Sequence, residues 1–103
     1  MRALVTAARP PAASPQTKNF AADDVAGQAE QVMQNMGAIL TAAGSSYGQV
    51  VKTTILLVDM ADFATVNEVY GKYFPSEPPA RATFAVKGLP LGALVEIEAT
   101  ALL

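Results

Sequence analysis

Apolar residues recur at helical spacing between residues 23 and 44. They are Val25, Ala29, Val32, Met33, Met36, Ile39 and Leu40, and they share one face of a helix. Asp23 or Asp24 can cap the N-terminus, where an acidic side chain also meets the positive end of the helix dipole. Gly44 suits the C-terminal stop. The pattern predicts a helix whose apolar face, methionines included, packs in the core.

A nearly continuous apolar run, from Val50 to Met60, follows this helix. It is rich in β-branched residues, and Lys52 is its only charged residue before Asp59. Such a run is typical of a strand at the centre of a sheet, buried on most of both faces.

A second helical repeat begins after Asp62, which is a suitable N-cap. Its apolar face comprises Phe63, Val66, Val69, Tyr70 and Phe74, and three prolines, Pro75, Pro78 and Pro79, end it. Within this helix we interpret Asn67 as a surface amide and Tyr70 as a core or interface anchor.

Two segments with alternating side chains complete the pattern. In residues 81–86, Arg81, Thr83 and Ala85 alternate with Ala82, Phe84 and Val86. In residues 94–103, Glu96, Glu98 and Thr100 oppose Val95, Ile97, Ala99 and Ala101. The order helix, strand, helix, strand, strand predicts an α+β fold with two helices packed on one face of a sheet. Prolines interrupt residues 8–19, and the preceding "ALVTA" could add a short strand.

Composition narrows the choice of partners. The chain has 103 residues, of which 51% are hydrophobic and 16% charged, so we expect one small domain that buries some apolar surface against another subunit. The net charge is −2, with acids and bases interspersed, and this argues against nucleic-acid binding. No apolar run approaches the ~20 residues of a membrane span, so we expect no membrane contact.

The sequence contains no cysteine and no histidine. Thiol chemistry, imidazole bases and most transition-metal sites are therefore excluded, and we expect neither a metal nor a cofactor. Catalysis would have to come from carboxylates, Lys, Arg, Tyr, hydroxyl groups, backbone groups or bound water.

One pairing of charges is unusual. Arg81 opens one strand and Glu96 lies within the next, so the two side chains can share a cavity if the strands lie near one another. Arginine is well suited to bind a carboxylate, a glutamate in a partly dry cleft can activate water, and Thr83 points the same way as Arg81. The alternative is a simple cross-strand ion pair, which contributes roughly 0–1 kcal/mol at a surface and implies no function. Glu98, on the same strand face as Glu96, competes for its role.

Three patches carry a family resemblance. "DFATVNEVY", "PPARATFAV" and "LVEIEATALL" resemble the second helix, the arginine strand and the C-terminal strand of the RidA/YjgF family of reactive-intermediate imine deaminases. The plant plastid-type members are the most similar, and the resemblance covers about residues 15–103. It implies a chorismate-mutase-like α+β fold assembled as a homotrimer, with ligand clefts between neighbouring subunits.

The resemblance also implies an activity. Family members hydrolyse reactive enamines and imines, such as 2-aminoacrylate, to 2-keto acids and ammonia, which is the reaction of a 2-iminobutanoate/2-iminopropanoate deaminase. By this similarity Arg81 binds the substrate carboxylate, Glu96 orients the attacking water, and Thr83 stands where many members carry cysteine or another small polar residue. The resemblance makes a chloroplast or a mitochondrion the candidate compartment, with the cytoplasm as the alternative.

The N-terminal segment departs from the family pattern. The family begins with two strands that carry "GPYSQA"-type and "SGQ"-type motifs, and neither motif is found here. We therefore divide the chain into a divergent N-terminal extension, residues 1–14, and a RidA-like domain, residues 15–103, in which the first two family strands are missing. A second hypothesis is then a non-catalytic trimeric module that binds small carboxylates or proteins. A third, a chorismate-mutase-type enzyme, rests on fold alone.

Overall fold

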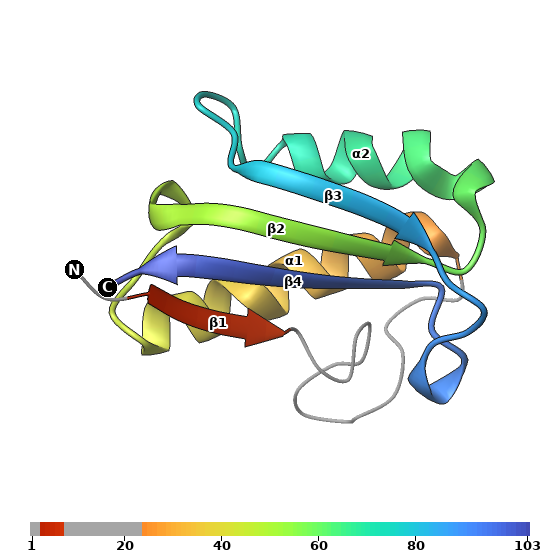
Figure 1. Ribbon diagram of the computed structural model, residues 1–103, viewed down its shortest axis with the longest axis horizontal. Coiled ribbons are helices and arrows are strands. Elements are labelled where there is room, and N and C mark those ends of the chain that lie inside the picture. Colours follow the sequence, from red (N-terminus) through yellow and green to blue (C-terminus); the bar gives the residue numbers. More distant parts are fainter. Residues whose placement is uncertain (1–2, 8–23) are drawn as a thin grey trace.

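The computed structural model describes residues 3–7, by their backbone only, and residues 24–103. The strands are β1 (Ala3–Ala7), β2 (Val50–Leu57), β3 (Ala80–Ala85) and β4 (Val95–Leu102), and the helices are α1 (Val25–Ala42) and α2 (Phe63–Gly71). The strands form a sheet of order β1-β4-β2-β3, in which β2 and β3 are parallel and the other pairs are antiparallel. Both helices lie on the same face of this sheet (Figure 1). The predicted α+β architecture is confirmed.

Helix α1 begins and ends much as its sequence indicates. The Asp24 carboxylate accepts a hydrogen bond of 3.1 Å from the Gly27 amide, so Asp24 is the cap. At the other end Gly44 has a φ of 81°, a left-handed conformation that glycine adopts without strain. The prediction of burial is wrong for Ile39, whose exposed fraction is 36%. The helical repeat sets it about a quarter of a turn from the stripe through Met36 and Leu40.

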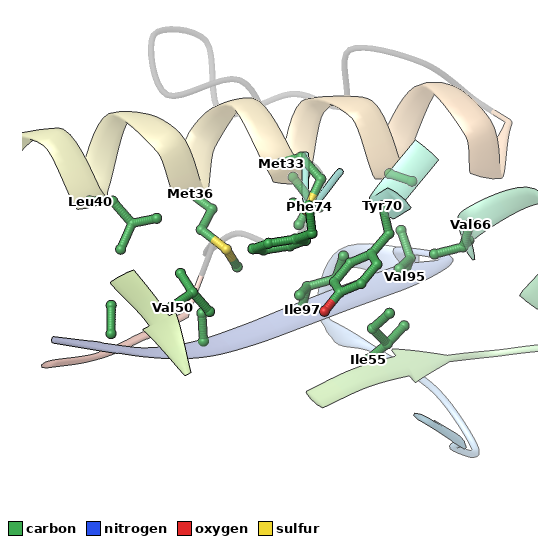
Figure 2. Close-up of a cluster of buried hydrophobic side chains, with 14 of the residues drawn as sticks. Met33, Met36, Leu40, Val50, Ile55, Val66, Tyr70, Phe74, Val95 and Ile97 are labelled. Atoms are coloured by element: carbon green, nitrogen blue, oxygen red, sulfur yellow. The ribbon is translucent and has the colours of Figure 1, made fainter. Parts of the chain in front are cut away.

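The core lies between the two helices and one face of the sheet (Figure 2). Met33, Met36 and Leu40 of α1 have no exposed surface, and neither do Ile55, Leu57, Val95 and Ile97 of the central strands. Tyr70 and Phe74 complete this layer, with ring centroids 4.8 Å apart. Rigid aromatic rings thus fill the space where α2 meets the sheet.

Strand β2 is central, as predicted, but only one of its faces is buried. Thr53, Ile55 and Leu57 point toward the helices and are buried, whereas Lys52 is exposed and Leu56 half-buried on the other face. The prediction of burial on both faces is therefore wrong for the single chain, because neither helix covers the second face.

Strand β2 ends at Leu57, earlier than the predicted end at Met60. Residues Met60–Asp62 form a turn of 3₁₀-helix, and the Asp59 carboxylate accepts a hydrogen bond of 2.9 Å from the Ala61 amide. Asp62 occupies the N-cap position of α2 without a side-chain bond. The capping role expected of Asp62 is thus performed by Asp59, one turn earlier.

The outer strands flank the two central ones. β1 pairs with β4 from Ala3 opposite Leu102 to Ala7 opposite Glu98, so the expected short strand in "ALVTA" is confirmed. β3 pairs with β2 and not with β4. The segments that carry Arg81 and Glu96 are therefore separated by a strand, although they are consecutive in the sequence.

Candidate functional site

Arg81 lies at the sheet edge and is held by α2. It is paired with Thr53 of β2, whose side chain is buried beneath the helices, so Arg81 points to the helix-covered face. Its guanidinium carbon lies 5.3 Å from the Phe63 ring centroid and 5.2 Å from that of Tyr70. A guanidinium nitrogen also donates a hydrogen bond to Oδ1 of Asn67. The parallel connection from β2 through α2 to β3 brings these residues together, because it packs the helix over its own two strands.

A hydrogen bond to strand β2 fixes the position of Tyr70 in turn. Its hydroxyl lies 2.7 Å from Oγ1 of Thr53, and both side chains are buried. Burial raises the pKa of Tyr70, while its hydrogen bond with Thr53 and the positive charge of Arg81 act to lower it. The phenol is therefore neutral at physiological pH, and its ring is a rigid support for the guanidinium.

An open cleft of about 380 Å³ adjoins Arg81. Its lining comprises Asn67, Tyr70, Gly71, Phe74, Pro78, Pro79 and Arg81. Among the residues that the structure describes, Asn67 is the only hydrogen-bond partner of Arg81, so other guanidinium N–H groups are left for a ligand. A preorganised guanidinium at the edge of an apolar cleft is suited to bind a carboxylate in a bidentate manner.

Thr83 lies on the same face as Arg81, as predicted from the alternation. It is paired with Ile55, and its hydroxyl oxygen is buried with no hydrogen-bond partner in the described part of the chain. Such a hydroxyl is costly unless something completes its bonding, so Thr83 is available to a ligand or a water molecule.

Glu96 lies on the opposite face of the sheet. It is paired with Leu56, whose side chain points away from the helices, and β2 separates it from Arg81. It is 9% exposed, and its Oε1 has no partner among the described residues. The structure thus brings Arg81 and Thr83 to one face and leaves Glu96 on the other. The alternative interpretation, a cross-strand ion pair between Arg81 and Glu96, is wrong because their strands are not neighbours.

Sequence reasoning missed the residues that support Arg81. Asn67 was interpreted as a surface amide, yet it bonds to the guanidinium, and Tyr70 and Phe63 stack against it. The spacing of these residues is a signal that could have found them. Positions 63, 67 and 70 share one face of a helix, so a cation that reaches that face meets all three.

The described residues contain no cluster of acidic side chains that could hold a metal ion. In the same part of the chain, no helix combines the length and the apolar character needed to cross a bilayer.

Comparison with known proteins identifies relatives over most of the chain. The profile of the family described as endoribonuclease L-PSP matches residues 2–103. The chain is 56% identical to the chloroplastic Reactive Intermediate Deaminase A of Arabidopsis thaliana over 89 residues, which are 86% of this chain and 48% of the relative. It is 50% identical to the human 2-iminobutanoate/2-iminopropanoate deaminase over 88 residues, or 85% of this chain and 64% of that protein. The chain therefore spans about half to two thirds of these relatives.

Solved structures agree with this relationship. The YjgF gene product of E. coli is 37% identical, with a TM-score of 0.90 over 99% of this chain and 81% of that one. E. coli TdcF, solved with bound serine, is 36% identical, with a TM-score of 0.89 over 98% of this chain and 80% of its own. The chain belongs to the endoribonuclease L-PSP family, the family of the RidA/YjgF deaminases.

Proposed function

We propose that this protein hydrolyses reactive imines and enamines, such as 2-aminoacrylate and its tautomer 2-iminopropanoate, to 2-keto acids and ammonia. The observation that carries this proposal is Arg81, stacked on two aromatic rings and hydrogen-bonded to Asn67 at the edge of an open cleft. The names of the deaminase relatives and the serine bound to TdcF support a small substrate that carries a carboxylate.

The chemistry requires positioning more than activation. Arg81 binds the substrate carboxylate and thereby fixes the imine carbon. Glu96 orients a water molecule and accepts its proton as the water oxygen bonds to the carbon of the protonated imine, C=NH2+. The resulting tetrahedral carbon carries a hydroxyl and an amino group. Glu96 returns the proton to the amino nitrogen, which leaves as ammonia, and the hydroxyl proton passes to solvent, which leaves the keto acid. Thr83 supplies a hydrogen bond from its otherwise unpartnered hydroxyl.

We further propose that each site is shared by two subunits of a homotrimer. Arg81 and Glu96 lie on opposite faces of the sheet, so they can act on one substrate only if they come from different copies. The sheet face that bears Glu96 also exposes apolar surface, and the exposed fraction of Phe84 is 56%. Apolar surface of this kind is suited to a subunit contact.

The test measures ammonia and pyruvate released from 2-aminoacrylate generated in situ. We expect Arg81→Ala to lower kcat/KM by about 10- to 100-fold, because one charge-assisted contact is lost. Lys87→Ala is the matched control, since Lys87 is an exposed cation outside the cleft and its removal should leave the rate unchanged. An Arg81→Ala variant with the wild-type rate would show that the carboxylate site is wrongly assigned.

The non-catalytic hypothesis makes a different prediction. A binding module would bind pyruvate saturably, in a manner lost in Arg81→Ala, while ammonia release would equal that of a protein-free control. The same assay therefore separates the two hypotheses.

The division into an extension, residues 1–14, and a domain, residues 15–103, remains a proposal. So does the compartment, for which the chloroplastic relative favours a plastid over a mitochondrion or the cytoplasm. A fluorescent fusion of the whole chain tests the location.

A further inference from the structure

The cleft beside Arg81 is longer than a three-carbon substrate needs. Four of its lining residues, Asn67, Tyr70, Gly71 and Phe74, follow one side of α2 and of the helical turn that continues it. Seven residues of helix rise about 10 Å, and Arg81 is bonded to the first of them. The two outer carbons of a three-carbon acid are only about 2.5 Å apart, so such a substrate would leave most of the cleft empty.

The part of the cleft beyond Arg81 is apolar and rigid. Tyr70 and Phe74 are 4% and 8% exposed, and their rings are packed in the core (Figure 2), so the part of the cleft that they line is fixed. Pro78 and Pro79 also line the cleft, and their rings restrict the backbone. Among the described residues, Arg81 is the only charged one that lines the cleft. A ligand that fills this space must therefore place an apolar chain there.

Gly71 keeps this space open. A Cβ atom built at Gly71 would have no other atom within 4 Å, so a larger side chain there would extend into unoccupied space along the cleft. The backbone does not require glycine at this position, because Gly71 has no positive φ. Glycine also weakens a helix relative to other residues. Glycine therefore leaves unoccupied space at this position of the cleft.

We infer that Gly71 makes this protein selective for imines of 2-keto acids with an extended apolar side chain, of about five or six carbons, over those of three or four. The inference rests on the proposed function, since it takes Arg81 as the anchor of the carboxylate. The apolar chain would then run from Arg81 over Gly71 toward Phe74.

Equilibrium binding of a homologous series tests this inference. Calorimetry with pyruvate, 2-oxobutanoate, 2-oxopentanoate and 2-oxohexanoate gives the affinity of the whole protein for each chain length. We expect the wild type to gain about two- to fourfold in affinity for each methylene group, as expected for partial to full burial of that group. In Gly71→Leu we expect the ratio of 2-oxohexanoate to pyruvate affinity to fall toward one.

Gly88→Leu is the matched control. Gly88 also has open space around it and no positive φ, but it lies in the loop after β3 and outside the cleft. It should keep the wild-type ratio. A wild type whose affinity does not rise with chain length would overturn the inference, and so would equal ratios in Gly71→Leu and the wild type. Both failures leave the loss of binding in Arg81→Ala intact, whereas binding that survives in Arg81→Ala would refute the proposed function itself.

Discussion

At the scale of single residues, the feature that bears most directly on the proposed ligand site is the support around Arg81. A free arginine side chain has many rotamers, and holding it in one conformation costs entropy when a ligand binds. Here the guanidinium contacts two rings and one amide before any ligand arrives. Tyr70 is central to this support because it also bonds downward to Thr53. The site is therefore connected to the core through one buried hydrogen bond.

That bond leads to a prediction about stability. Tyr70→Phe keeps the ring under Arg81 but leaves the Thr53 hydroxyl buried without its partner, which should lower the free energy of unfolding by about 1–3 kcal/mol. Adding Thr53→Val removes the orphaned hydroxyl, so the double variant should recover most of the loss. Urea unfolding of the four proteins in this cycle measures both effects. A double variant less stable than Tyr70→Phe would mean that the bond is not the cause.

At the scale of elements, the close approach of α1 to the turn after it depends on Gly37. A Cβ atom at Gly37 would lie 2.9 Å from the hydroxyl oxygen of Tyr47 and 3.1 Å from its Cε2. Tyr47 cannot easily yield, because its hydroxyl donates to the Met33 carbonyl and its ring packs against Tyr73 at 5.1 Å. Burial raises the pKa of Tyr47 to about 12, in keeping with a phenol held inside the fold.

We therefore expect Gly37→Ala to destabilise the protein. The gain in helix propensity is about 1 kcal/mol, and the overpacking against Tyr47 costs about 1–3 kcal/mol, so the net loss should reach up to about 2 kcal/mol. Gly71→Ala is the control, because a Cβ there meets nothing within 4 Å and should leave stability unchanged or raised. Thermal unfolding of both variants measures the two changes in stability. Equal effects at the two positions would contradict a clash at Gly37.

Most elements follow from local signals in the sequence. The cap at Asp24, which was one of two candidates with Asp23, the left-handed stop at Gly44 and the alternation around Arg81 each involve a few neighbouring residues and were predicted from them. The prediction that β2 is buried on both faces was wrong for the single chain, because an apolar run does not reveal which other elements cover the strand. Leu56 is half-buried in the single chain, and only another subunit or segment could bury it further.

At the scale of the whole molecule, the relation between Arg81 and Glu96 was beyond sequence reasoning. Period-two alternation correctly assigned Arg81 and Thr83 to one face. It could not reveal that β3 would pair beyond β2, because that choice depends on a parallel connection between strands that are distant in sequence. The two candidate groups were thus singled out from the strand pattern and given roles by the family resemblance, while their opposite orientation emerged only from the sheet order.

That opposite orientation yields the sharpest prediction for the assembly. If each site combines Arg81 of one subunit with Glu96 of the next, then Arg81→Ala and Glu96→Gln should each be at least about 10-fold slower than wild type as pure proteins. Co-expressed with different tags and purified as mixed trimers, they should regain activity, because an Arg81→Ala subunit still supplies Glu96 to a neighbour that retains Arg81. In a cyclic trimer that contains both variants, one of the three sites is intact, so the deamination rate of the purified mixed trimers should return to about a third of wild type. Mixed trimers of Arg81→Ala with the double variant Arg81→Ala/Glu96→Gln are the control and should be no faster than pure Arg81→Ala, since no subunit retains Arg81. A mixed assembly that contains both tags and shows no recovery would mean that the two groups do not share a site across subunits.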